Sequence, residues 1–229
     1  MIEGGNQDKP SMVRLGGPQD PAMKLSDLTN LDQPVRRLNE ITGEVDSFSL
    51  QEYVANPKYF LAYGLLIIGA DDTTGFGKSL AAIVIALHWL QRFVTAGLVS
   101  KEKACVVLHN TIDGMRDSQE HMCSYVPVVL DEFMPADAEQ NQYCSADMLK
   151  GLMNINKPRD VRARLRQVRL CSHQPIIITA NGNSEADWVG ARFKWSAPLA
   201  RKICVCQITR PLFLDEVRAR GPVSVTVQC

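Results

Sequence analysis

The chain has 229 residues, of which 45% are hydrophobic and 22% are charged. Lys and Arg number 25 together, as do Asp and Glu, so the formal net charge is zero. These values exclude a wholly disordered chain and a strongly basic or acidic one, and the length suits one domain with an appendage.

No stretch of the sequence predicts a membrane span or a secretory signal. The longest unbroken apolar run, 80–87, is far shorter than the roughly 20 residues that a spanning helix needs. The first ten residues contain neither a basic segment nor an apolar core. Seven cysteines are scattered along the chain, and the pair Cys204 and Cys206 has no second Cys or His pair at zinc-site spacing. We therefore expect no membrane contact and an intracellular, reducing location, with nucleus and cytoplasm not distinguished.

Residues 1–47 are predicted to form a flexible arm and short capping helices. The first 20 residues are rich in Gly and Pro and poor in apolar side chains, which is typical of a mobile arm. Between residues 23 and 41, apolar side chains recur every three or four positions, which predicts short helices that Pro34 interrupts. We expect these helices to cap the core, with contact to a neighbouring subunit as the alternative.

Five short apolar runs rich in β-branched residues follow, and each is continuous rather than alternating. They span residues 65–69, 104–108, 126–130, 175–179 and 203–208. Such runs fit strands that are covered on both faces, as in a parallel sheet with helices between the strands. The clearest helix covers residues 80–94, where apolar side chains form one stripe. The pattern predicts an α/β sandwich over residues 48–229.

A glycine-rich segment, 69–80, joins the first run to this helix. Its glycines allow successive N–H groups to turn towards one point, where the amino end of the helix adds partial positive charge. The ammonium of Lys78 would contact the β and γ phosphates of ATP, and the hydroxyl of Ser79 would bind Mg2+. The expected ATP-binding residues are Thr74, Gly75, Phe76, Gly77, Lys78, Ser79 and Leu80.

Position 72 departs from the usual phosphate-loop pattern. Asp72 stands where the first glycine is expected, and Asp71 precedes it. Carboxylates repel a triphosphate, although Asp tolerates a left-handed backbone better than most residues do. Three interpretations stay open: a loop that supports hydrolysis, a loop that binds nucleotide weakly or without turnover, and a glycine-rich turn without ligand.

Polar residues follow the third and fourth runs, at the strand ends where open α/β sheets bind ligands. Asp131 and Glu132 follow the third run, and Asn181 follows the fourth. We expect Asp131 to hold Mg2+ through water and Glu132 to orient or deprotonate the attacking water. Asn181 would reach the γ-phosphate or this water if the fourth strand lies between the first and the third. The alternatives are an ordinary acidic turn and an Asn that only forms a turn.

Three segments, TTGFGKS, VVLDEF and PIIITAN, occur in this order along the chain. They resemble Walker A, Walker B and motif C of the superfamily 3 helicases of small DNA and RNA viruses, which belong to the AAA+ class of P-loop ATPases. The resemblance covers residues 48–215 and is strongest to the ATPase half of replication initiators of small circular single-stranded DNA viruses. It implies a three-layer P-loop NTPase sandwich whose five-stranded, mainly parallel sheet has the order 5-1-4-3-2. It also implies a ring, expected to be a hexamer, that moves 3′ to 5′ along single strands.

The interval between the second and third motifs is strongly basic. Residues 157–169 contain six cations and one Asp. Arg162, Arg164 and Arg166 alternate with apolar residues, so a strand would present all three on one face. Such a row suits a nucleic-acid backbone, and its affinity should fall with salt. The resemblance implies a hairpin here that contacts single-stranded DNA or RNA; the alternative is a solvated basic hairpin without ligand.

The resemblance also implies an arginine finger, offered to the nucleotide of the adjacent subunit. Arg192 and Arg201 are the candidates, and Arg201 is preferred because it directly precedes the fifth run. Initiators of rolling-circle replication carry a His-x-His nuclease site. The four histidines of this chain include no such pair, so we expect no nicking activity.

The leading hypothesis is an ATP- and Mg2+-dependent motor on single-stranded nucleic acid. A second hypothesis is a nucleotide-gated or inactive binding protein derived from such an ATPase, which Asp72 and the missing nuclease half motivate. A third is a small-molecule P-loop kinase in which the arginine-rich segment acts as a lid. The third ranks last because kinase chemistry has no clear use for Asn181.

Overall fold

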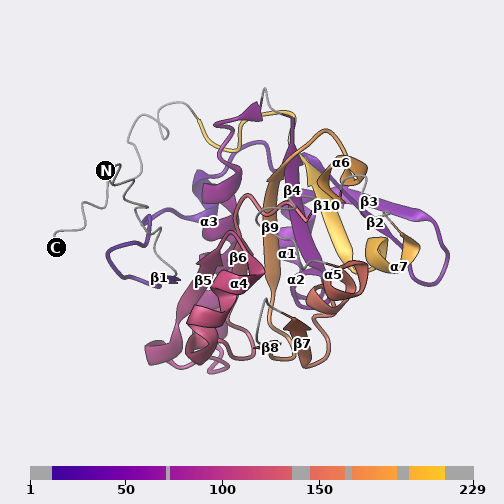
Figure 1. Cartoon of the computed structure of the whole chain (residues 1–229). Helices are drawn as coiled ribbons and strands as arrows, with labels where there is room; N and C mark the ends of the chain where they lie inside the picture. Colours follow the sequence, from indigo (N-terminus) through magenta and orange to yellow (C-terminus); the bar gives the residue numbers. More distant parts are fainter. Residues whose placement is uncertain (1–11, 71–72, 136–144, 163–166, 190–195, 215–229) are drawn as a thin grey trace, which may run out of the picture.

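In the computed structural model the described residues are 12–70, 73–135, 145–162, 167–189 and 196–214. They form an eight-stranded sheet in the order β1-β5-β6-β9-β4-β10-β2-β3, and a separate two-stranded one (Figure 1). The strands of the large sheet are β1 (Met12–Arg14), β2 (Pro34–Leu38), β3 (Val45–Ser49), β4 (Gly64–Gly69), β5 (Cys105–His109), β6 (Val128–Leu130), β9 (Ile176–Asn181) and β10 (Ile203–Gln207). The two-stranded sheet pairs β7 (Arg159–Arg162) with β8 (Gln167–Leu170).

The centre of the large sheet consists of the five apolar runs. Their strands, β5, β6, β9, β4 and β10, are all parallel to one another. Numbered in chain order and counted from β10, they stand in the order 5-1-4-3-2. All six residues of β4 are buried, as expected for a strand that is covered on both faces. The protein is therefore an α/β protein with a mostly parallel central sheet.

The expectation of a five-stranded sheet was wrong, because three antiparallel strands extend it at both edges. β1 pairs with β5, β2 pairs with β10, and β3 pairs with β2. An unpaired edge presents a row of free N–H and C=O groups, so additional strands there satisfy the backbone. Residues 12–14 thus belong to a strand and not to a mobile arm, and Val13 is buried. Residues 1–11 lie outside the described part of the chain.

The expectation of capping helices between residues 23 and 41 was also wrong. The one helical turn there is the 3-10 helix η1 (Leu25–Asp27), and Pro34 begins strand β2 instead of interrupting a helix. Proline is tolerated at the first residue of a strand. The apolar spacing was misleading because pairing with β10, not local periodicity, decides the conformation of residues 34–38.

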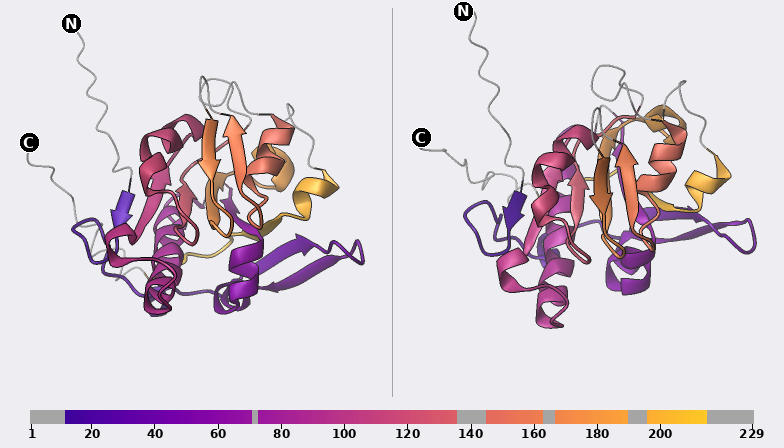
Figure 2. Two further views of the ribbon diagram at one scale, coloured as in Figure 1. Left: turned by 90° about the horizontal axis from the view of Figure 1, so that it is seen from below. Right: turned by 60° about the horizontal axis from the view of Figure 1, so that its bottom comes forward.

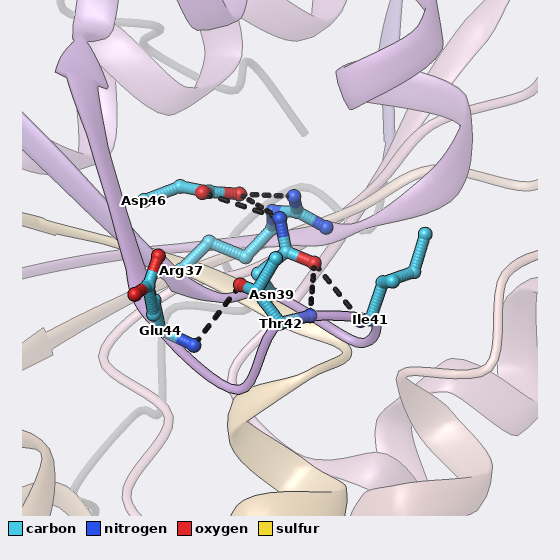
Figure 3. Close-up of polar contacts among 6 residues, drawn as sticks. All are labelled: Arg37, Asn39, Ile41, Thr42, Glu44 and Asp46. Atoms are coloured by element: carbon cyan, nitrogen blue, oxygen red, sulfur yellow. Dashed lines mark hydrogen bonds and ion pairs between the residues drawn. The ribbon is translucent and has the colours of Figure 1, made fainter.

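The turn between β2 and β3 is determined locally by its side chains (Figure 3). The Oδ1 atom of Asn39 accepts hydrogen bonds from the N–H groups of Ile41, at 2.9 Å, and Thr42, at 3.2 Å. Its amide nitrogen donates to Asp46, which also pairs with Arg37. Asn often fixes turns in this way. Ile41 is 95% exposed, so burial of its side chain does not stabilise the turn. The hydrogen bonds of Asn39 do so instead.

Helices cover both faces of the sheet. They are α1 (Leu50–Ala55), α2 (Pro57–Ala62), α3 (Lys78–Thr95), η3 (Lys101–Lys103), α4 (Ile112–Met115), η4 (Arg116–His121), α5 (Ala146–Leu152), α6 (Glu185–Val189) and α7 (Ala197–Ala200). The longest, α3, packs against β4, β5, β6 and β9, with α1 and α2 on the same side; α4, α5 and the β7–β8 pair lie on the other side (Figure 2). Among the described residues, none of these helices has the length and apolarity that crossing a bilayer requires.

Candidate functional site

The three polar segments singled out in the sequence meet at one edge of the sheet. β9 lies between β4 and β6, so the carboxyl ends of these three strands are adjacent. Asn181, the last residue of β9, pairs with Gly69, the last residue of β4. The N–H of Gly182 donates to the carbonyl of Gly69 at 2.9 Å. Asn181 therefore lies beside the residue from which the glycine-rich loop departs.

The glycine-rich loop contains several internal hydrogen bonds. The hydroxyl of Thr73 donates to the carbonyl of Ala70 at 2.6 Å, and the N–H of Phe76 donates to the carbonyl of Thr73 at 3.0 Å. The ammonium of Lys78 donates to the Thr73 hydroxyl at 3.3 Å, so it lies over the loop. Asp72 lies outside the described residues.

Two glycines of the loop adopt backbone conformations that other residues rarely accept. Gly75 has φ +82° and Gly77 has φ +85°. A Cβ atom on Gly75 would have no other atom within 4 Å, whereas one on Gly77 would lie 2.6 Å from Cδ2 of Phe213. Gly77 is thus required for two reasons, and Gly75 for its backbone alone.

The loop ends at the amino end of α3. Gly77 is the N-cap, offers no side-chain acceptor, and accepts the first intrahelical bond from Ala81 at 2.8 Å. A helix leaves its first N–H groups without partners inside the helix and carries partial positive charge there. Ser79 and Leu80 follow within this first turn. The backbone, the helix end and the Lys78 ammonium together suit the phosphates of a nucleotide.

One hydroxyl holds the Asp131 carboxylate and the Glu132 backbone to β9. Oγ1 of Thr179 donates to Oδ1 of Asp131 at 2.7 Å and accepts from the N–H of Glu132 at 3.0 Å. The N–H of Phe133 donates to the carbonyl of Thr179 at 3.0 Å, and that of Asp131 donates to the carbonyl of His109 at 2.7 Å. Thr179 is 1% exposed, so the hydroxyl itself is buried.

Glu132 has a left-handed backbone, with φ +53°. For a residue other than glycine this conformation costs roughly 1–2 kcal/mol. The hydrogen bonds from Glu132 and Phe133 to Thr179 hold the turn in place, and the indole N–H of Trp188 caps the carbonyl of Phe133 at 2.8 Å. The Glu132 side chain is exposed at the sheet edge. Strain held at a polar strand end is a feature of functional sites.

The donors at this edge fit a magnesium ion that arrives with a nucleotide. The hydroxyl of Ser79 and the carboxylate of Asp131 are both oxygen donors, which Mg2+ prefers, and Mg2+ usually takes one or two carboxylates, several waters and substrate phosphates. Within the described ranges no group of three or more His, Cys, Asp or Glu could hold a metal by itself. Phosphate oxygens would therefore have to complete the coordination.

Arg201 lies at the other end of the strands, near the amino ends of β10 and β4. It is the C-cap of α7, two residues before Ile203, and Ile203 pairs with Gly64 at the start of β4. The length of β4 separates this end from the loop that follows Gly69, about 16 Å at roughly 3.3 Å per residue. Arg201 therefore cannot reach the loop of its own chain. Its buried Nε atom has no hydrogen-bond partner in the described part of the chain, and Arg192 lies outside that part.

The basic hairpin exposes fewer cations than its sequence offers. Arg162 is exposed at the end of β7, whereas Arg164 and Arg166 lie outside the described residues. Arg159 is 8% exposed and donates to the carbonyls of Leu152, Cys171 and Gln174 at 2.9, 3.0 and 3.3 Å. Burial lowers the pKa of Arg159 to about 10. Arg159 is thus a structural residue, although the sequence pattern placed it among the six cations of the basic segment.

The sequence matches no protein-family model and no curated protein.

Proposed function

We propose that the chain binds ATP with Mg2+ at the carboxyl edge of its sheet and hydrolyses it, as a motor of the superfamily 3 type on single-stranded nucleic acid. The observation that carries the proposal is the position of β9 between β4 and β6. This order brings Asn181 and Thr179 between the glycine-rich loop and the Asp131–Glu132 pair. A sheet that kept these strands apart would leave each motif as an isolated turn.

Each residue of this edge has a role in the proposed hydrolysis. Residues 74–80 bind the phosphates through backbone N–H groups and the Lys78 ammonium. Ser79 and Asp131 hold Mg2+, which neutralises charge on the β and γ phosphates when bound. Glu132 orients the attacking water and accepts its proton, and Asn181 donates its amide to this water or to a γ-phosphate oxygen.

The proposed assembly is a ring in which Arg201 completes the nucleotide site of the adjacent copy. The distance of Arg201 from its own loop supports a role between copies, because an arginine finger in the same chain is excluded by that distance. Arg162, Arg164 and Arg166 would contact the phosphates of single-stranded DNA or RNA, and this contact should weaken as salt rises. The second candidate, a nucleotide-gated protein without turnover, is favoured by Asp72.

The test is ATP turnover by the wild type, Lys78→Ala and Glu132→Gln. We expect Lys78→Ala to lose nucleotide binding, and Glu132→Gln to bind nucleotide but to turn it over about 10²- to 10⁴-fold more slowly. Lys101→Ala and Glu102→Gln, at exposed positions of η3, are the matched controls. Equal rates in the wild type and both site variants would refute the assignment.

A second measurement separates the motor from the gated binding protein. Turnover is followed with and without single-stranded DNA and RNA across a salt series. Stimulation that disappears as salt rises supports the motor and links the basic hairpin to the site. Binding of ATP without turnover under all of these conditions supports the gated protein.

A further inference from the structure

The segment after β10 crosses the carboxyl edge of the sheet and contacts the glycine-rich loop. We call residues 208–213 the strap; it follows β10 towards the start of α3 in Figure 1. The N–H of Ile208 donates to the carbonyl of Ile68 at 2.7 Å, and that of Leu212 donates to the carbonyl of Phe76 at 2.9 Å. The ring of Phe213 packs on Gly77. Leu212 and Phe213 are both buried, so the strap covers the loop from outside the sheet.

A single buried amide holds the beginning of the strap. Oε1 of Gln33 accepts from the N–H groups of Thr209, at 2.7 Å, and Arg210, at 3.0 Å. Nε2 of Gln33 donates to the carbonyl of Arg210 at 3.1 Å. The residue has no exposed surface. Loss of this side chain would remove all three hydrogen bonds and leave the part-buried N–H groups of Thr209 and Arg210 without this partner.

The residues before Gln33 hold the rest of the strap. Nδ2 of Asn30 donates to the carbonyl of Pro211 at 2.6 Å, and the N–H of Thr29 donates to the carbonyl of Leu212 at 2.8 Å. Arg210 also pairs with Asp32 at 2.7 Å, but both side chains are exposed and such pairs contribute little. Residues 29–33 therefore bind the strap along its length, and the strap binds the loop.

We propose that Gln33 is a positioning residue for the phosphate loop, and that it raises nucleotide affinity through the strap. The connection runs from Gln33 to the backbone of Thr209 and Arg210, and then through Leu212 and Phe213 to Phe76 and Gly77. A glycine-containing loop loses much conformational entropy when it is fixed. A loop that is already held in its binding shape does not bear this cost when ligand arrives. The inference rests on the proposed nucleotide site.

The alternative is that Gln33 only stabilises the junction of β2 and β10. That role predicts a lower free energy of unfolding with unchanged affinity in the folded protein. Positioning predicts weaker binding together with increased mobility of the loop before any nucleotide is added. Affinity and loop mobility, measured on folded protein, therefore distinguish the two roles.

The main variant is Gln33→Leu, which keeps approximate volume and removes all three hydrogen bonds. Calorimetric titration with ATP and Mg2+ should show binding about tenfold weaker than that of the wild type. The matched control is Gln174→Leu. Gln174 is equally buried but lies just before β9, at the amino ends of the strands and away from the glycine-rich loop. Its Oε1 accepts from the N–H of Cys171 at 3.0 Å. We expect Gln174→Leu to bind nucleotide like the wild type.

A milder variant, Asn30→Gly, guards against failure of Gln33→Leu to fold. Asn30 has φ +53°, which glycine accepts, so the variant loses only the hydrogen bond from the Asn30 side-chain amide to the Pro211 carbonyl. We expect a loss of affinity in the same direction and about threefold in size. If Gln33→Leu does not fold, Asn30→Gly decides the question.

Hydrogen–deuterium exchange without nucleotide gives a readout that does not depend on binding. Exchange of residues 73–80 should rise in Gln33→Leu and in Asn30→Gly, but not in Gln174→Leu. Unchanged exchange in both strap variants would overturn the inference, as would wild-type affinity in both. If the wild type binds no nucleotide, the proposed function is wrong, and exchange still shows whether the strap orders the loop.

Discussion

The two sides of the candidate site are held in different ways. The side formed by the glycine-rich loop is held from outside the sheet, by a strap that leaves β10 and by residues 29–33. The carboxylate side is held from within the sheet, because Thr179 of β9 binds both Asp131 and Glu132. The first arrangement brings together three segments that are distant in sequence, whereas the second uses two neighbouring strands.

This difference assigns different consequences to the two sides. A loop that needs external support should lose nucleotide affinity when the support is removed, because more ordering is then required on binding. The Asp131 carboxylate and the Glu132 backbone are positioned by a neighbouring strand. Removing that support should lower the reaction rate instead, because a small displacement of a catalytic group affects turnover more than binding. Affinity and kcat are therefore expected to respond to substitutions on opposite sides of β9.

The largest effect is expected from Gly77→Ala. An added Cβ would lie 2.6 Å from the Phe213 ring, and the φ of +85° is unfavourable for alanine. The loop and the strap would have to separate, so we expect ATP binding to become undetectable by calorimetry while the fold is kept.

Gly75→Ala is the matched control, because its φ is +82° but nothing lies within 4 Å of the new Cβ. It carries only the backbone cost of roughly 1–2 kcal/mol, which corresponds to binding about tenfold weaker. Similar affinities for the two variants would show that contact with the strap does not matter.

Thr179→Val should have the next largest effect, and on the other side of the site. Valine has the shape of threonine but removes the hydroxyl that contacts Asp131 and Glu132. We expect kcat for ATP to fall about 10- to 100-fold with little change in affinity, which single-turnover and titration measurements can separate. Thr179→Ser keeps the hydroxyl and should recover most of the rate. Weaker binding at an unchanged kcat would reverse the assignment of the two sides.

The central strands could be predicted from the sequence, but the edge strands could not. The five runs are continuous and apolar, which is the pattern of strands buried on both faces. Their order came from the resemblance and not from the runs themselves. In β2 only Val35 is buried, so its short pattern is too weak to distinguish from that of a helix. Pairing with β10 decides the conformation of β2, and β10 is remote from β2 in the sequence.

The sequence predicted those residues of the candidate site that directly follow an apolar run, such as Asp131, Glu132 and Asn181. Thr179 was missed, although a single polar residue in the run IIITA was a usable signal. Gln33 gave no signal, because its partners are backbone groups of residues 209 and 210. Arg159 and Arg162 look alike in the sequence, but Arg159 is buried and donates to three backbone carbonyls, whereas Arg162 is exposed. Side-chain identity alone cannot reveal such long-range partners.

The smallest expected effect is a loosening of the carboxylate side in acid. His109 ends β5, lies 2.9 Å from the Ser118 hydroxyl through Nε2, and accepts the Asp131 N–H at its carbonyl. Burial lowers the pKa of His109, with a smaller opposing effect of Asp117. The unfolded chain therefore takes up a proton more readily, so this contribution to stability is present above about pH 6.5 and is lost as the pH falls below it.

Hydrogen exchange can locate this loss. Between pH 7.5 and pH 5.5, after correction for intrinsic rates, exchange of residues 128–133 should increase more than that of residues 73–80. Burial also lowers the pKa of His88, on α3. If acid lowered the stability of the whole fold, hydrogen exchange of both segments would rise together. His109→Gln removes the titrating group and should reduce the difference between the segments. An equal increase in both segments in the wild type would mean that acid acts on the whole fold and does not distinguish the two sides of the site.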